Sequence, residues 1–439
     1  MIPRKASAIL SQIIKNKETF NNVVLVEGAR QVGKTTLVRE TLKGLSIPFK
    51  EFNLEEKGTL CEKIDLCKDF DEFTQLVDFE MQFPRGQDIF LFIDEAQESR
   101  KLGGFIRFMK EKWENTQVIL SGSSLSRIFR DETRYPVGRV TPLHLQPLSF
   151  EEFLIGQGQQ KLVSQLQSIF PEKRAIAPST HQLLLDNLQK YMEVGGLPEV
   201  VHLFSQGKNW HQKRLEILLG YYNDFKRIFG ETFQPYLVAA LKTTAYLLGS
   251  PFKNTHVSFL LEGGKNQEII KALGQLENWK IIFRVDQRGS FPESHFHPKR
   301  YLFDIGIAKE LRESVVPPIH LLKTLNEVDR TSLGGLIENM VVNALVSQTP
   351  KLCGWKKSSS GSEVDLVLKR NDDIIPIECK SSLTIKNSHL SGLRDFMSVF
   401  KVPKGFVVSL APFEVRKLSA QQTLILLPLY LVESWQRFI

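Results

Sequence analysis

The sequence lacks the features that would place the chain in a membrane or outside the cell. No apolar stretch reaches the roughly 18 residues of a membrane-spanning helix, and the richest, 424–432, is interrupted by Pro428. The first residues contain no long apolar segment followed by a cleavage site, so we expect no signal peptide. The four cysteines have neither the number nor the spacing for a disulfide framework or a four-ligand zinc site. These absences favour a cytoplasmic protein without a membrane partner.

Internal repeats and low-complexity tracts are also missing, and 42% of the residues are hydrophobic, as in a globular protein. A chain of 439 residues is too long for one ordinary core, so its length predicts two or three domains. The net charge is +8, with an excess of +6 over 201–300 and +5 over 351–439. This excess beyond residue 200 suggests a polyanionic partner, and a well-solvated basic surface is the alternative.

Short β-rich runs alternate with helical patterns through the first 150 residues, as they do in βαβ units. Five consecutive apolar residues, IFLFI, are typical of a central parallel strand that is covered on both faces. The alternation predicts an α/β domain with a parallel sheet. The expected strands are 23–28, 47–53, 89–93 and 118–120, and the expected helices are 35–42, 70–83 and 105–113.

The segment GARQVGKT follows the first expected strand and opens the first expected helix, and it matches the P-loop pattern G-x-x-x-x-G-K-[ST]. Its backbone N–H groups can surround the phosphates of ATP, and the helix N-terminus adds a favourable dipole. We expect Lys34 to reach the β- and γ-phosphates and Thr35 to offer its hydroxyl to Mg²⁺. The expected nucleotide-binding residues are Gly28, Ala29, Arg30, Gln31, Val32, Gly33, Lys34, Thr35 and Thr36.

An acidic pair after the strand IFLFI supplies the second half of the same site. Asp94 lies at the end of the strand, where it can hold Mg²⁺, and Glu95 can polarise the attacking water as a catalytic base. Ser121 or Ser123, just after the strand at 118–120, lies where a hydroxyl could contact the γ-phosphate, with a simple turn as the alternative. ATP and Mg²⁺ are therefore the expected cofactors.

Several segments together resemble a known family. GARQVGKTTLV, FIDEAQ, VILSGSS, PVGR, LSFEEFL and YMEVGGLPEVV, with RYLFDIGIA and EVDLVL…IECKSS, are similar to bacterial and archaeal AAA+ ATPases usually described only as ATP-binding proteins. The last segments resemble the domain of unknown function that follows the ATPase in that family. The resemblance implies that Arg139 of PVGR is an arginine finger that acts on a neighbouring subunit, with a surface arginine as the alternative.

The resemblance and the helical pattern after residue 150 predict four regions. These are an AAA+ core at 1–147, a helical lid at 148–205, a helical and winged-helix domain at 206–330, and an α/β domain with a restriction-endonuclease-like fold at 331–439. A winged helix binds either nucleic acid or protein. If it binds nucleic acid, the candidate phosphate contacts are Lys271, Arg284, Arg288, Lys299 and Arg300.

A second set of polar residues lies near the C-terminus and resembles the PD-(D/E)xK nuclease signature. Glu378 and Lys380 are two residues apart on an expected strand, so both side chains face one side, and Asp365 on the partner strand can approach Glu378. Two carboxylates there could bind Mg²⁺, with Glu338 from the preceding helix, while Lys380 positions an attacking water. An ion-pair cluster without catalysis is the alternative reading of these residues.

The sequence thus favours an oligomeric, Mg²⁺-dependent AAA+ ATPase that couples hydrolysis to the binding or processing of nucleic acid, with DNA ahead of RNA. One alternative is a nucleotide-dependent switch that binds a protein partner and carries an inert nuclease-like domain. Another is a metal-dependent nuclease that uses ATP only to assemble. Stimulation of the ATPase by nucleic acid, a protein captured only in the ATP state, or metal-dependent nicking would distinguish the three.

Overall fold

The computed structural model describes most of the chain and divides it into two compact units. Unit 1 comprises Met1–Gln146 with Asn278–Lys280, and unit 2 comprises Pro147–Glu277 with Ile281–Ile439. The expected finer division of unit 2 into lid, winged helix and C-terminal domain stays a prediction. The described residues are 2–16, 18, 22–82, 89–129, 136–170, 176–261, 263–289, 296–346, 348, 352–358, 361–370 and 373–439.

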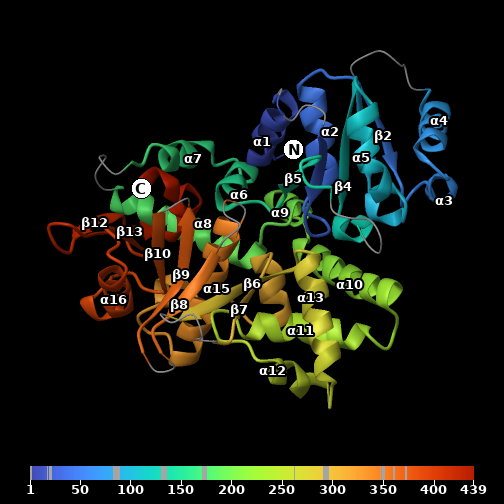
Figure 1. The fold of residues 1–439 in the computed structure, drawn as a ribbon. Helices are drawn as coiled ribbons and strands as arrows, with labels where there is room; N and C mark the ends of the chain where they lie inside the picture. The colour runs from blue at the N-terminus through green and yellow to red at the C-terminus, as the bar shows by residue number, and fades with distance from the viewer. Residues whose placement is uncertain are drawn as a thin grey trace. The chain divides into compact units, whose positions relative to one another are not determined.

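Unit 1 is built on a parallel five-stranded sheet in the order β2-β3-β4-β1-β5. Figure 1 labels β2, β4 and β5 of this sheet. The structure confirms the parallel α/β sheet expected from the sequence, and β3 is buried along its whole length, as its apolar run predicts. The strands are β1 Val23–Glu27, β2 Phe49–Asn53, β3 Ile89–Asp94, β4 Thr116–Gly122 and β5 Val140–His144. The α-helices are α1 Lys5–Lys15, α2 Lys34–Gly44, α3 Gly58–Leu66, α4 Phe70–Met81 and α5 Leu102–Lys112.

Aromatic side chains from two of these helices fill the core beside the sheet. Phe73 of α4 stacks on Phe105 of α5 with the ring centroids 4.7 Å apart, and the Trp113 ring lies 5.8 Å from Phe73. The N-terminus of α4 is capped by Asp69, whose carboxylate accepts the N–H groups of the next turn. The expected end of this helix at residue 83 lies outside the described residues.

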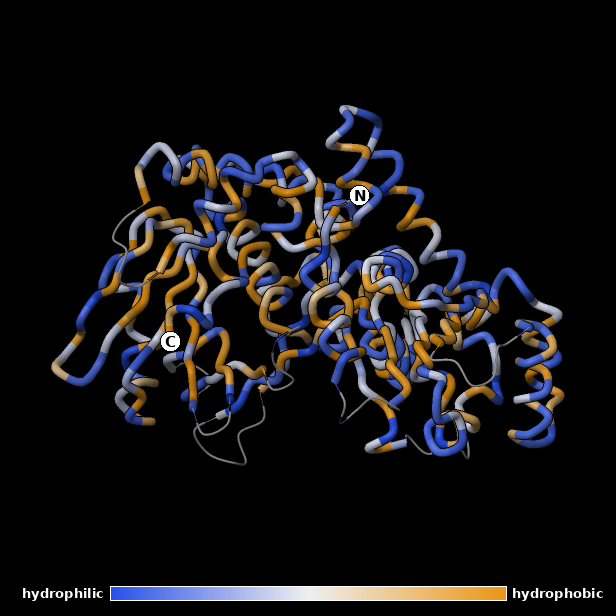
Figure 2. The backbone as a smooth tube through the Cα atoms, turned by 90° about the horizontal axis from the view of Figure 1, so that it is seen from above, coloured by the Kyte–Doolittle hydropathy of each residue, from blue (hydrophilic) through white to orange (hydrophobic). Residues whose placement is uncertain are grey.

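Unit 2 contains an eight-stranded mixed sheet in the order β12-β13-β11-β10-β9-β8-β6-β7. Figure 2 shows hydrophobic stretches of backbone alternating with hydrophilic ones along the chain. The strands are β6 Ile282–Gly289, β7 Lys299–Leu302, β8 Leu352–Lys356, β9 Glu363–Arg370, β10 Asp373–Lys380, β11 Lys404–Ser409, β12 Glu414–Lys417 and β13 Thr423–Pro428. The α-helices are α6 Phe150–Gly156, α7 Gln160–Gln167, α8 Pro178–Val194, α9 Pro198–Ser205, α10 Trp210–Phe229, α11 Gln234–Tyr246, α12 Asn254–Ser258, α13 Asn266–Asn278, α14 Ile305–Arg312, α15 Glu327–Val346 and α16 Ser391–Val399.

The helices α11 to α13 precede an antiparallel pair, β6 and β7, in the order expected for the winged-helix region. The β6 strand also pairs in parallel with β8, so this region and the C-terminal region share one sheet. Residues 290–295, between β6 and β7, and residues 371–372, between β9 and β10, lie outside the described residues. Within the described ranges, none of the helices has the length and apolar character needed to cross a membrane.

Two of the segments that carry the family resemblance, GGLPEVV and RYLFDIGIA, contact each other in unit 2. The carboxylate of Asp304 accepts the N–H of Gly196 at 2.7 Å and the N–H of Ile307 at 2.9 Å, so it caps α14 and fixes the turn that ends α8. Gly195 has a φ of 85°, and a Cβ there would lie 2.6 Å from Asp304 Oδ1. Only glycine fits that approach without strain.

Replacing Asp304 with alanine should therefore destabilise unit 2 by about 2–4 kcal/mol, because two buried N–H groups lose an ionic acceptor. Denaturant unfolding of the full-length protein would measure the loss. The matched control is Asp186→Ala, which removes an exposed carboxylate from α8 and should change stability by less than about 0.5 kcal/mol. Equal effects of the two substitutions would contradict the capping role of Asp304.

Candidate functional site

The P-loop connects β1 to α2 at the carboxyl edge of the parallel sheet. Gly33 ends the loop with a φ of 91°, a left-handed conformation that side chains rarely adopt, and α2 begins at the next residue. Because all five strands are parallel, the residues that follow β1, β3 and β4 meet at this same edge. In the loop and first turn of α2, Ala29 and Val32 are buried, Arg30 lies 3.5 Å from Glu55, and Gln31 and Thr36 are exposed.

The Lys34 side chain turns back over the loop. Its ammonium donates to the carbonyl oxygens of Gly28 at 3.1 Å and Ala29 at 3.0 Å, and the residue is buried. Burial lowers the pKa of Lys34, against the charges of Glu95 and Asp94, which raise it. Its hydrogen-bond partners are neutral carbonyls, so the ammonium can exchange them for an anionic ligand.

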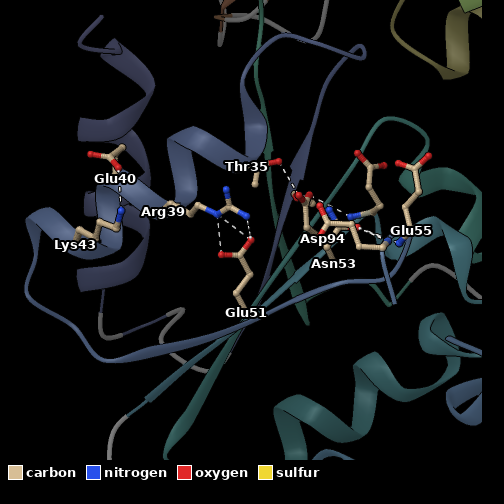
Figure 3. Close-up of polar contacts among 11 residues, drawn as sticks. Thr35, Arg39, Glu40, Lys43, Glu51, Asn53, Glu55 and Asp94 are labelled. Atoms are coloured by element: carbon tan, nitrogen blue, oxygen red, sulfur yellow. Dashed lines mark hydrogen bonds and ion pairs between the residues drawn. The ribbon is translucent and has the colours of Figure 1, made fainter. Parts of the chain in front are cut away.

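Asp94 is the point where three elements meet. Its Oδ2 accepts the hydroxyl of Thr35 from α2 at 2.6 Å (Figure 3). Its Oδ1 accepts the hydroxyl of Ser121 from β4. The helix α2 is tied further to the sheet by Arg39, which forms a two-pronged ion pair with Glu51 of β2, also drawn in Figure 3. A carboxylate and a hydroxyl in direct contact are the hard oxygen ligands that Mg²⁺ prefers, so the residues present fit the expected metal.

Glu95 has a φ of 51°, a left-handed conformation that is costly for a residue with a Cβ. Burial raises the pKa of the Glu95 carboxyl, while the Lys34 charge opposes the rise. Gln97 donates its side-chain N–H to Glu95 Oε2 at 2.5 Å and holds the carboxylate in place. The role of Gln97 was not predicted from the sequence, although Gln97 lies two residues after the predicted base. Ser123 is half-buried in the turn after β4.

Arg139 lies at the opposite end of the strands from the P-loop. It immediately precedes β5, whose first residue pairs with Val23 at the start of β1, so it lies at the amino ends of these strands. The P-loop follows their carboxyl ends, roughly 17 Å away for five residues per strand. The Arg139 guanidinium is about one-third exposed and is held by Glu111 Oε1, at 2.9 Å from Nη2 and 3.1 Å from Nε.

In unit 2 the structure brings together the four residues that resemble a nuclease signature. Asp365 of β9 and Glu378 of β10 lie at the end of an antiparallel pair, and Asp365 Oδ2 accepts the N–H of Cys379 at 2.9 Å. Lys380 donates to Glu378 Oε1, and Glu338 extends from α15. All three carboxylates are buried. That these residues bind a metal and cut nucleic acid stays a prediction.

A lysine that the sequence analysis assigned elsewhere completes this cluster. Lys299 of β7 donates to Glu338 Oε1 at 2.8 Å and to Asp365 Oδ1 at 3.1 Å, and the hydroxyl of Tyr301 donates to the same Glu338 oxygen. Lys299 and its neighbour Arg300 are only 4% and 6% exposed, so the expectation that they contact phosphates on a wing surface is wrong. The sequence KRY at 299–301 indicates that Lys299 and Tyr301 lie on the same face of the strand, because residues two apart on a strand share a face.

Burial and the neighbouring charges shift the pKa values of the groups in this cluster. Burial raises the pKa of Glu378 to about 8, with a further contribution from the Asp365 charge, and burial raises the pKa of Glu338 to about 7. Burial alone would raise the pKa of Asp365 as well, but the ammonium groups of Lys299 and Lys380 hold it below its ordinary value. The two nearest carboxylates outweigh burial at Lys299 and raise its pKa well above the usual range.

Three family models match separate stretches of the chain. Residues 20–154 match the model described as an AAA domain, and the P-loop, Asp94, Glu95 and Arg139 all lie inside this stretch. Residues 185–315 and 333–430 match two models described as domains of unknown function, DUF8612 and DUF4143. The N-terminal region is therefore an AAA domain, which confirms that part of the resemblance.

Among known proteins, one from Haemophilus influenzae described only as uncharacterized is 22% identical in an alignment of 405 residues, and 87% of each chain is covered. The Aeropyrum pernix Orc1 protein, solved in complex with DNA, has a TM-score of 0.32 and 13% identity over 72% of this chain and 93% of that one. The Thermotoga maritima RuvB Holliday junction branch migration motor has a TM-score of 0.30 and 14% identity over 67% and 92%. Scores this low say nothing about what this chain binds.

Proposed function

We propose that this protein is a Mg²⁺-dependent ATPase whose AAA domain binds and hydrolyses ATP at the carboxyl edge of its sheet. The observation that carries the proposal is the meeting of Lys34 and Thr35, at the start of α2, with Asp94, at the end of β3, each oriented by hydrogen bonds. The loop N–H groups and Lys34 would bind the phosphates, and Thr35 and Asp94 would hold Mg²⁺. When bound, Mg²⁺ would neutralise charge on the phosphate oxygens.

In this proposal Glu95 orients the attacking water and accepts its proton. A carboxyl group with a raised pKa suits this role, because a general base works best with a pKa near the working pH. The hydrogen bond from Gln97 and the left-handed backbone at Glu95 restrict where its carboxylate can lie. Ser121 acts through Asp94, since its hydroxyl donates to that carboxylate, and Ser123 is the candidate for direct contact with the γ-phosphate.

The first test separates binding from hydrolysis. Lys34→Ala should lose most ATP affinity, because it removes the cation of the phosphate site, whereas Glu95→Gln should bind ATP normally and turn it over at least 100-fold more slowly. Equilibrium binding of a fluorescent ATP analogue and steady-state phosphate release would measure the two effects. Hydrolysis by Glu95→Gln at the wild-type rate would show that another group is the base.

We further propose that Arg139 acts on the ATP of a neighbouring subunit. It cannot reach the P-loop of its own chain, because the length of the sheet separates them. Its ion pair with Glu111 is partly exposed, so exchanging that partner for a phosphate costs little. The proposal makes the protein a homo-oligomer with active sites between subunits.

Arg139→Ala should then bind ATP but hydrolyse it at least 100-fold more slowly, and wild-type specific activity should rise with protein concentration. Mixing Arg139→Ala with Glu95→Gln subunits should restore part of the activity, because some interfaces then contain both intact groups. Arg107→Ala is the matched control, since it removes the other arginine bonded to Glu111 and should leave activity unchanged. A monomeric protein with ATP, active independently of concentration, would exclude this arrangement.

We also propose that unit 2 couples ATP hydrolysis to nucleic acid, with DNA favoured over RNA. The support is the basic excess of the sequence beyond residue 200 and the exposure of Lys271 on α13 and of Arg284 and Arg288 on one face of β6. Arg284 is partly neutralised by Asp286, at 2.7 Å. The alternative remains a nucleotide-dependent switch in which these surfaces bind a protein.

The double substitution Lys271→Glu with Arg284→Glu should weaken binding of the full-length protein to DNA and reduce the dependence of its affinity on salt, since fewer counterions are released. Fluorescence anisotropy at two or more salt concentrations would measure both. Lys161→Glu with Lys208→Glu changes the net charge equally at exposed positions on other helices and loops, and should have the smaller effect. If wild-type protein binds no DNA or RNA at low salt, the protein-partner switch becomes the better proposal.

A further inference from the structure

The carboxylates that a nuclease centre would use to bind metal already enclose a cation of the chain itself. The Lys299 ammonium lies within hydrogen-bonding distance of both Glu338 and Asp365, at 2.8 and 3.1 Å. The lysine is 4% exposed and the two carboxylate residues are 7% and 8% exposed. The ammonium therefore lies between the two groups that a shared metal ion would have to bridge.

The remaining bonds of the cluster hold this arrangement in place. Tyr301 donates to the Glu338 oxygen that Lys299 also contacts, the Cys379 N–H donates to Asp365, and Lys380 donates to Glu378. A divalent ion between Glu338 and Asp365 would displace the Lys299 ammonium from both carboxylates to which it donates. Leaving a buried charge unpaired costs several kcal/mol, so the cluster as it stands does not fit a divalent ion.

We propose that the Lys299 ammonium is the resident cation of this cluster, in the position of a divalent metal, and that the cluster is a structural ion-pair centre. It joins β7 to α15 and β9, and Lys299 and Tyr301 reach it from the same face of β7. In this proposal the cluster does not catalyse the cutting of nucleic acid. The nuclease-like region then serves the ATPase as a binding or structural module.

The same geometry predicts that a divalent cation can bind among the carboxylates once the Lys299 ammonium is removed. We call this position the hidden site. Lys299→Met leaves three carboxyl groups with a single ammonium group, that of Lys380, so the cluster becomes more negative. Glu378 Oε2 is already a buried oxygen without a hydrogen-bond partner among the described residues. A divalent ion would offset the added charge and could use the freed oxygens of Glu338 and Asp365.

Thermal unfolding of the full-length protein, without nucleotide and with or without Mn²⁺, tests this prediction. The melting temperature of Lys299→Met should lie about 6 °C or more below wild type, and Mn²⁺ should restore several degrees. Arg300→Met is the matched control, because Arg300 is equally buried on the other face of β7 and pairs with Glu277 instead. It should be destabilised without rescue by Mn²⁺, and so should Lys299→Met combined with Asp365→Asn. A folded Lys299→Met protein that Mn²⁺ does not stabilise would contradict the hidden site.

A second measurement decides the proposal even if Lys299→Met fails to fold. Electron paramagnetic resonance of free Mn²⁺ would count the ions bound by wild type and by Asp365→Asn, and we expect equal numbers, because any ion at the P-loop is common to both. A Mn²⁺ ion held by wild type and lost in Asp365→Asn would overturn the proposal. Mg²⁺- or Mn²⁺-dependent cutting of DNA or RNA by wild type that Asp365→Asn abolishes would overturn it equally.

Discussion

A carboxylate that is removed from water must receive hydrogen bonds from the protein. Three buried aspartates meet this requirement by bringing distant segments of the chain together. Asp94, Asp304 and Asp365 are 1%, 2% and 8% exposed. Each accepts donors from segments far away in the sequence, so each fixes how those segments meet. Asp94 orders the nucleotide site, Asp304 joins two helices of unit 2, and Asp365 holds the C-terminal cluster.

The two candidate sites differ most clearly in what their buried lysines bind. Lys34 donates to neutral carbonyl oxygens and its pKa is lowered, so its charge is only weakly compensated within the protein. Lys299 donates to two carboxylates and its pKa is raised. An anionic ligand therefore improves the surroundings of Lys34, whereas a cationic ligand would have to compete with Lys299. This contrast favours ligand binding at the P-loop and a structural role for the C-terminal cluster.

The nucleotide site could be predicted closely from the sequence because its signals are local. The P-loop motif, a strand before it and a helix after it are contiguous, and parallel strands bring Asp94 to the same edge. The C-terminal cluster could be predicted only in part. The strand spacing predicted that Asp365, Glu378 and Lys380 would meet, but Lys299 lies 66 residues before Asp365. Nothing local shows that β7 lies beside α15 and β9, so the lysine was assigned to the surface.

The partners of Lys299 also explain why two stretches matched by different family models form one unit. Lys299 and Tyr301 belong to the stretch 185–315, while Glu338 and Asp365 belong to 333–430. The strands β6 and β8 pair across the same divide. A backbone ladder and a buried ion-pair cluster therefore connect the two stretches at adjacent points. Separating them would expose an unpaired strand edge and deprive two carboxylates, Glu338 and Asp365, of their buried cation, so both penalties favour folding as one body.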